Sequence, residues 1–182
     1  MTLIPKPIQK NWIHFVIWTA VLVYVVAARP FYTHYMLKDG KPVSFDKELP
    51  ERMTKKITYA VDRIDPIVVH GQNLYEIWGW SFLKGETNQS AYERLIVLQS
   101  DSQTYFFATT NKARPDVQTT YADLQIDISN SGFSAHISKD VLKRGTYQIG
   151  ILLENRDNDE VYYLATNKSI LRTANKLQLL PP

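Results

Sequence analysis

From Ile57 onward the chain alternates between apolar and polar residues, with a period of two that is typical of β-strands that bury one face. The clearest case lies within 146–153, where four apolar side chains (Tyr147, Ile149, Ile151, Leu153) would share one face. Short segments rich in Gly, Asn, Asp and Ser separate the runs and are typical of turns. The pattern predicts strands over residues 57–65, 74–83, 93–99, 104–109, 124–128, 133–137, 146–153 and 161–166.

Seven or eight short strands, separated by turns, indicate an all-β protein rather than one with a parallel sheet and crossover helices. The predicted fold is an antiparallel, immunoglobulin-like (Ig-like) β-sandwich over residues 56–182. A single helical turn is expected at 139–145, ended by Gly145. Alternation alone does not separate a sandwich from a closed barrel, so a barrel remains an alternative.

The N-terminal part has a different pattern. Residues 12–28 contain no charge, no Gly and no Pro, and Lys10 and Arg29 flank them. Such a helix would span roughly 25 Å, at the short end for a bilayer core of about 30 Å. We therefore predict a single transmembrane helix that acts as an uncleaved signal-anchor.

Two alternatives compete with the transmembrane helix. A cleaved signal peptide would end near 26–28, where small residues precede Arg29, but the apolar run is longer than usual for such a peptide. A buried helix of a soluble fold would normally show one polar face, which this run lacks.

The transmembrane helix would divide the chain into four parts. Residues 1–11 would form a short tail, and residues 29–55 would form a juxtamembrane connector, either a stalk or a strap packed against the domain.

Basic residues lie on both sides of the helix, so the positive-inside rule does not fix its orientation. We favour an N-terminus inside and an extracytoplasmic β-domain, because a short tail before an early apolar run is typical of an export signal.

Composition excludes several function classes. The chain contains no Cys, which rules out disulfides and thiolate chemistry and fits a bacterial envelope. Its formal net charge of +3 comes entirely from Lys6, Lys10 and Arg29, since residues 30–182 hold 18 basic and 18 acidic side chains. A nucleic-acid-binding domain would concentrate basic residues on itself, so nucleic acid is not an expected partner.

Several short motifs occur in a fixed order along the domain. They are Gly79-Trp80 (GW), 114–117 (RPDV), 131–133 (SGF), and a segment at 142–147 with Leu, Gly and Tyr (LxxGxY). Their succession resembles a β-sandwich module of bacterial envelope-associated proteins, and it covers roughly residues 57–168. The resemblance implies an accessory or binding module rather than a catalyst, and it implies no defined ligand.

No catalytic constellation or metal site is visible in the sequence. Ser81 lacks the second glycine of a nucleophile elbow, and the four His residues are widely separated. The acidic segment 157–160 lacks the spacing and the glycine of a calcium-binding loop. We therefore predict a protein that is not an enzyme and that has no catalytic residues, no metal and no cofactor.

Four residues are candidates for binding. Trp78 and Trp80 would lie on one face of a strand, either as a platform for sugar rings or as core anchors of the sandwich. Arg114 and Asp116 would form either a ligand-facing pair or a tie between the long irregular passage and the sheet.

The predicted function is that of a membrane-anchored accessory or protein-interaction module of the cell envelope. Its partners would be the lipid bilayer and either another membrane protein or a cell-surface glycan. The alternative is a carbohydrate-binding module that assists in handling cell-surface glycans.

Overall fold

The computed structural model describes residues 16–24, 39–50, 54 and 56–181. The chain divides into two compact units between residues 38 and 39. In the first unit the structure describes a helix over residues 16–24, whose apolar side chains are exposed. The rest of the predicted transmembrane segment, 12–15 and 25–28, lies outside the described residues. No described helix is both long and apolar enough to cross a membrane, so the span stays a prediction.

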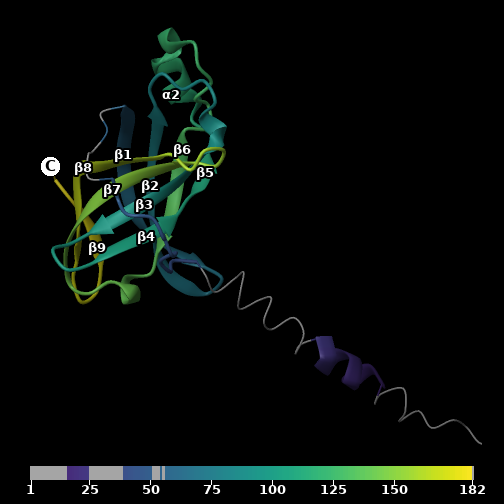
Figure 1. The fold of residues 1–182 in the computed structure, drawn as a ribbon. Helices are drawn as coiled ribbons and strands as arrows, with labels where there is room; N and C mark the ends of the chain where they lie inside the picture. The colour runs from purple at the N-terminus through teal and green to yellow at the C-terminus, as the bar shows by residue number, and fades with distance from the viewer. Residues whose placement is uncertain (1–15, 25–38, 51–53, 55, 182) are drawn as a thin grey trace, which may run out of the picture. The chain divides into compact units, whose positions relative to one another are not determined.

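The second unit consists of two antiparallel sheets, which confirms the prediction of an antiparallel all-β fold (Figure 1). The four-stranded sheet has the order β1-β2-β6-β5, with bounds Ile57–Val69, Gln72–Leu83, Gly132–Ile137 and Thr110–Lys112. The five-stranded sheet has the order β4-β3-β7-β8-β9, with bounds Thr104–Ala108, Tyr92–Gln99, Gly145–Asn155, Val161–Arg172 and Leu177–Leu180. The separate sheets exclude the alternative of a single closed barrel.

The main core lies between the sheets. The four predicted core residues of β7 are all buried there, as their alternation indicated: Tyr147, Ile149, Ile151 and Leu153. On β2, Ile77 and Leu83 face this core. Trp78 and Trp80 lie on the opposite, outer face of the sheet, so the interpretation of these tryptophans as anchors of the main core is wrong.

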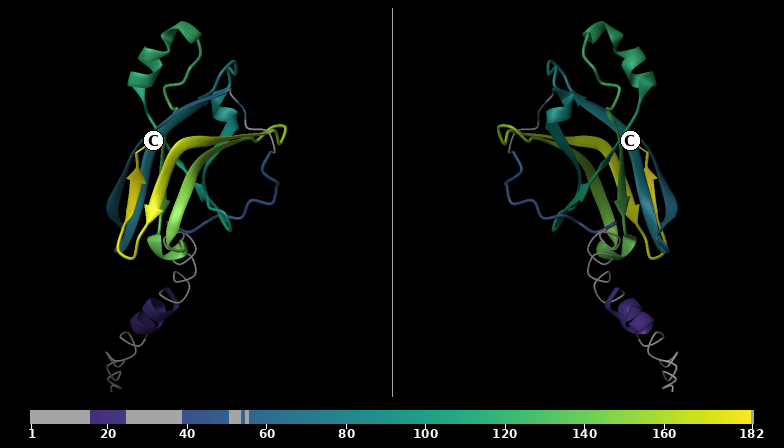
Figure 2. Two further views of the ribbon diagram at one scale, coloured as in Figure 1. Left: turned by 90° about the vertical axis from the view of Figure 1, so that its left-hand side faces the viewer. Right: turned by 90° about the vertical axis from the view of Figure 1, so that its right-hand side faces the viewer.

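Residues 39–50 form a strap on the outer side of the five-stranded sheet (Figure 2). Val43 pairs with Phe106 on the edge strand β4, and the Phe45 ring lies 4.9 Å from the Phe106 ring. The Nζ atom of Lys47 bonds the carboxylate of Glu154 at 2.6 Å. Of the two forms expected for the connector, this part takes the strap, and it belongs to the same compact unit as the sandwich.

The strap explains a continuous apolar run on β3. Ile96 and Leu98 face the main core, whereas Leu95 and Val97 face outward and pack in a second cluster with Phe45 and Leu49. Both faces of the strand are therefore buried, although the strand belongs to an antiparallel sheet.

The passage between β5 and β6 differs from the sequence prediction. Residues 124–128 form no strand. Instead, the passage contains the short helix α2 (Pro115–Thr120) and the 3₁₀ turn η2 (Ala122–Leu124). Proline at the start of α2 is favourable because its missing N–H has no partner there in any helix. Val117 and Ile128 are buried against Phe82 on the outer face of β2, so hydrophobic contacts rather than strand pairing hold the passage.

The two ends of the sandwich are distinct (Figure 2). One end carries α2 and the turn η1 (Gln89–Ala91), and the other carries the turn η3 (Lys139–Val141). The unit begins at the η3 end, where the carbonyl of Gly40 accepts a hydrogen bond from the Ser138 N–H. The α2 end therefore lies far from the point where the chain enters the unit.

A buried tyrosine closes the turn that precedes β7. The hydroxyl of Tyr147 donates to the carbonyl of Lys143 at 3.0 Å. Burial raises the pKa of this phenol, so the hydroxyl keeps its proton at neutral pH. We expect Tyr147→Phe to lower the free energy of unfolding by about 1 kcal/mol, because one hydrogen bond to a turn carbonyl is lost.

Urea denaturation would measure this loss as a lower midpoint at an unchanged slope. Tyr75→Phe is the matched control, since its hydroxyl lies 3.5 Å from the nearest acceptor, at the limit of hydrogen bonding. Equal effects of the two substitutions would contradict a role for the Tyr147 hydroxyl.

Candidate functional site

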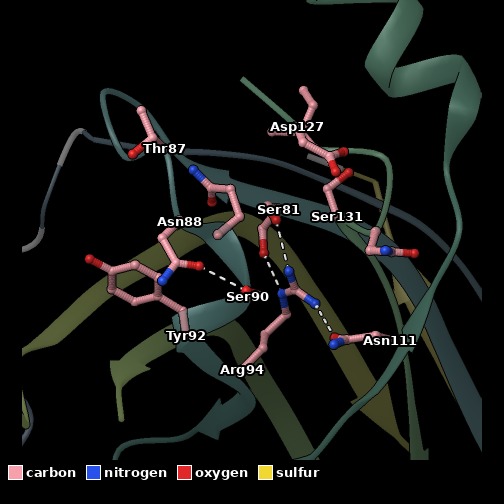
Figure 3. Close-up of a pocket in the computed structure, with 12 residues that line it drawn as sticks. Ser81, Thr87, Asn88, Ser90, Tyr92, Arg94, Asn111, Asp127 and Ser131 are labelled. Carbon is pink, nitrogen blue, oxygen red and sulfur yellow. Dashed lines mark hydrogen bonds between the residues drawn. The ribbon is translucent and has the colours of Figure 1, made fainter. Parts of the chain in front are cut away.

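A polar pocket of about 350 Å³ lies at the α2 end of the sandwich (Figure 3). It opens between the loop before β3 and the loop before β6, and the strand residues Ser81 and Arg94 form its inner part. Its lining is dominated by hydroxyl and amide side chains. The full lining is Ser81, Thr87, Asn88, Gln89, Ser90, Tyr92, Arg94, Asn111, Asp127, Ile128, Asn130 and Ser131.

Arg94 connects the two sheets beside the pocket. It lies on β3 of the five-stranded sheet, and its Nε and Nη2 atoms donate to Oγ and the carbonyl of Ser81 on β2, at 2.7 and 2.9 Å. Its Nη1 atom donates to Oδ1 of Asn111 on β5 at 3.1 Å and to the carbonyl of Gly132 on β6 at 3.4 Å. One guanidinium therefore bonds three strands of the opposite sheet.

The charge of Arg94 has no carboxylate partner in the described part of the chain, because all four acceptors are neutral. Burial lowers the pKa of this guanidinium to about 10, which still leaves it charged at neutral pH. The Phe133 ring, 5.4 Å from the guanidinium carbon, adds a favourable cation–π contact.

The loop before β3 is held by one glutamine. The side chain of Gln89 accepts from the backbone N–H of Leu83 at 3.0 Å and donates to the carbonyls of Leu83 and Glu86 at 2.8 and 2.7 Å. This amide therefore supplies backbone-like bonds where β2 ends. As a result, the neighbouring Asn88 and Ser90 are held at the rim of the pocket.

A second glutamine holds the loop before β6. Gln118 on α2 accepts from the N–H of Ile128 at 2.6 Å and donates to the carbonyl of Ile126 at 3.0 Å. Next to it, Oδ1 of Asp127 accepts from both the N–H and the hydroxyl of Ser129. The Ser129 hydroxyl, followed by its N–H, lowers the pKa of Asp127, so this rim residue is a carboxylate at neutral pH.

Ser131 carries an unusual hydroxyl. Its backbone is fully engaged, since its carbonyl accepts from the Ser81 N–H and its N–H donates to the Ile128 carbonyl. Its Oγ atom, however, is buried and has no hydrogen-bond partner in the described part of the chain. Buried polar groups are normally paired, so this hydroxyl beside the pocket is an exception.

The predicted binding residues Trp78 and Trp80 do not line the pocket. Around Trp78, the Arg63 guanidinium carbon and the Lys112 Nζ atom lie 5.0 and 5.2 Å from the ring centre. Trp80 stacks on Phe82 at 6.0 Å and contacts Tyr121 at 5.7 Å. Both indoles are half-buried and contact side chains of their own chain.

Arg114 and Asp116 are brought together, and they tie the passage to the sheet. The Arg114 guanidinium bonds the Asp116 carboxylate through Nε and Nη2, and its Nη1 atom bonds Asp62 on β1 at 2.7 Å. The Arg114 N–H also donates to the Ser129 carbonyl. This geometry favours the structural interpretation of the pair over the ligand-facing one.

The lining can bind a ligand, but it does not assemble a nucleophile and a base. Among its side chains, Asp127 is the one carboxylate, and no His or Lys is present. Within the described residues, no group of three His, Asp or Glu side chains is placed to hold a metal ion. The lining combines hydroxyls and amides with one cationic side chain, Arg94, and one anionic side chain, Asp127. Such a combination is suited to reversible binding of a polar molecule.

Of the residues that line this pocket, the sequence draws attention to Ser81 alone, and there only as a rejected nucleophile. One usable signal was Arg94, a charged residue that directly precedes the apolar run 95–98 of the same predicted strand. Another was the concentration of Asn and Ser at 87–90 and 127–131. Such segments are also typical of solvated turns. That they lie next to Arg94 could therefore be seen only once the fold was known.

Comparison with known proteins adds no relative. No family model matches the chain, and no curated protein or solved structure matches it significantly. Function is therefore inferred from the geometry of the pocket, and the resemblance of the short motifs stays a prediction.

The Arg114–Asp116 pair predicts a specific dependence of stability on pH. Arg114 lowers the pKa of Asp116 from 3.8 to about 2. A lowered carboxyl pKa contributes stability that is fully present above the unfolded value and is lost as pH falls towards the folded one. We therefore expect the stability difference between the parent and Asp116→Asn to be constant above about pH 4. It should then shrink steadily between about pH 4 and pH 2.

Urea unfolding at about pH 6, about pH 4, about pH 3 and about pH 2 would measure this difference. Asp101→Asn is the control, because Asp101 is exposed in the β3–β4 turn and forms no ion pair in the described part of the chain. Its difference from the parent should not change with pH. The same flat profile for Asp116→Asn would contradict the account of the pair.

Proposed function

We propose that this protein is a single-pass membrane protein that presents a non-catalytic, Ig-like β-sandwich outside the cell. There it acts as an accessory module of the cell envelope that binds a ligand in the Arg94 pocket. The observation that carries the proposal is the position of this pocket, braced by both sheets, at the end of the sandwich farthest from the chain's entry point.

The order of the strands supports the Ig-like assignment. Ig constant-type domains place strands A, B, E and D in one sheet and C, F and G in the other. Numbered along the chain, β1-β2-β6-β5 corresponds to A-B-E-D, and β3-β7-β8 corresponds to C-F-G, with β4 and β9 added at the edges. The Tyr147 hydrogen bond at the start of β7 matches the tyrosine corner described for strand F.

The position of the pocket supports a presenting role. Gly40 and Asp39 lie beside Ser138 at the η3 end, where Asp39 is also within 3.4 Å of His70 and within 3.6 Å of His136. An anchor that precedes residue 39 would attach the unit at this end. The pocket at the α2 end would then be directed away from the attachment point.

The membrane anchor rests on the sequence together with one structural feature. Residues 12–28 lack charge, and the described helix within them exposes large apolar side chains, such as Trp18 at 71% and Leu22 at 65%. A large exposed apolar surface on a helix requires a cover, and the hydrocarbon core of a bilayer provides one.

The alternative of carbohydrate binding through Trp78 and Trp80 has less support than binding in the pocket. A sugar ring stacks on an open aromatic face, whereas Arg63 and Lys112 already approach the Trp78 ring, and Trp80 already stacks on Phe82. The pocket offers unpaired polar groups instead.

The anchor predicts that the full-length chain stays in the membrane fraction after washing with alkaline carbonate. Replacing Leu22 and Val23 with Arg should release the chain or block its insertion. Each charge costs about 2.5–3.5 kcal/mol at the centre of a span. Full extraction of the parent chain by carbonate would refute the anchor, and a mature N-terminus at Arg29 would favour the cleaved signal peptide.

The binding role predicts that a fragment covering residues 39–182 sediments with washed cell envelopes of a strain that lacks the gene. The fragment starts at 39 because the strap covers Leu95 and Val97. The double substitution Asp127→Asn with Asn130→Ala should abolish sedimentation, whereas Asn73→Ala, in an exposed position at the other end of β2, should not. Equal sedimentation of all three folded fragments would contradict a role for the pocket.

A further inference from the structure

We propose that the Arg94 pocket binds a neutral polyhydroxylated ligand, namely a sugar residue. This inference rests on the proposed function, since it names the chemistry of the ligand that the module would bind. Two observations support it. The two rim loops carry polar groups without a described partner, and Arg94 already donates most of its hydrogen bonds within the protein.

The polar groups that remain available are neutral or negative. Asn130 makes no hydrogen bond in the described part of the chain. Asn88 uses its Oδ1 to accept from the Ser90 hydroxyl, which leaves its amide N–H groups available. The second carboxylate oxygen of Asp127 is also without a described partner, because Oδ1 accepts both bonds from Ser129. Amides and carboxylates in this mixture provide the donors and acceptors that sugar hydroxyls, which both donate and accept, require.

The use of Arg94 argues against an anionic ligand. A guanidinium has five N–H donors, and four hydrogen bonds from Arg94 already go to Ser81, Asn111 and Gly132. The one N–H left over cannot form the paired bonds that make an arginine selective for carboxylates or phosphates. Asp127 at the rim would in addition repel an anion.

The apolar part of the lining also suits a sugar. Tyr92 and Ile128 are the pocket's hydrophobic side chains, and the Tyr92 ring is held by an edge contact with Tyr162 at 6.1 Å. A sugar ring presents C–H groups on its faces and hydroxyls around its edge. An aromatic wall beside amide and carboxylate groups is complementary to both parts.

The site is fixed before any ligand arrives. Gln89 and Gln118 hold the two rim loops by hydrogen bonds to backbone atoms, and Arg94 holds the floor. Preorganisation reduces the ordering cost of binding, which matters for small polar ligands that bury little apolar surface.

Saturation-transfer-difference NMR on the full-length chain tests the proposal. The chain would be held in lauryl dimethylamine oxide micelles, because this detergent has no sugar headgroup. The probes are glucose, galactose, N-acetylglucosamine and, as the anionic arm, glucuronate. The expected result is saturation transfer to at least one neutral sugar, with competition among the sugars that bind.

Two substitutions decide the chemistry. Asp127→Asn keeps an acceptor for Ser129 but removes the charge, so it should weaken binding of the neutral sugar about tenfold and should not weaken that of glucuronate. Asn130→Ala should weaken neutral-sugar binding without lowering the melting temperature, since Asn130 is exposed. Asn73→Ala, the matched control, should leave the affinity unchanged.

Three outcomes would overturn the inference. They are absence of saturation transfer to every neutral probe from a chain that melts cooperatively, binding of glucuronate alone, and neutral-sugar binding that is indifferent to both pocket substitutions. If the 39–182 fragment still sediments with envelopes in a pocket-dependent way, only the sugar assignment fails. Loss of that sedimentation as well would mean that the proposed function itself fails.

Discussion

The bonds of the Arg94 guanidinium determine how the two sheets meet at the functional end of the sandwich. A cation in this half-buried position is costly to desolvate, and it is tolerated when good geometry and several hydrogen bonds compensate. Here the acceptors come from three neighbouring strands, β2, β5 and β6, while Arg94 itself lies on β3. Because these acceptors are neutral, the positive charge of Arg94 lies beside the pocket without a carboxylate bonded to it.

Three of the short motifs, GW, RPDV and SGF, meet around the Arg94 guanidinium. A side chain at Gly79 would collide with the carbonyl of Ala60 and with the Phe133 ring, so the glycine of GW makes room for the phenylalanine of SGF. A side chain at Gly132 would collide with Arg114, the first residue of RPDV. Phe133 then packs beneath the Arg94 guanidinium. These contacts between the three motifs are packing contacts within the domain.

Much of the fold could be predicted from local patterns. Strands such as β7 and β2 could be predicted because the alternation of residues along them indicates which face of the strand contacts the core. The missed features depend on contacts between distant segments. Residues 124–128 look like a strand, but Ile128 is buried against Phe82 from a loop. The strand β1 continues through Pro66, which an edge strand tolerates because one of its sides needs no donor.

The candidate site could be predicted far less well. Trp78 and Trp80 attracted attention because large aromatics are common in binding sites, yet in the structure they contact neighbouring cations and rings. Arg94 and the polar loops 87–90 and 127–131 form a candidate site only in combination. Residues 37 positions apart, such as Arg94 and Ser131, line one pocket only after the two sheets pack. That Arg114 and Asp116 bond each other could be expected from the sequence, because the two residues lie only two positions apart.

The most direct measurement is a double-mutant cycle between Arg94→Met and Ser81→Ala in the 39–182 fragment, with unfolding by urea at neutral pH. If the guanidinium joins the sheets through Ser81, the two losses of stability should be coupled by about 1 kcal/mol or more, in the range found for residues in one hydrogen-bond network. Losses that add within about 0.3 kcal/mol would show that the two side chains act independently, which would contradict the account.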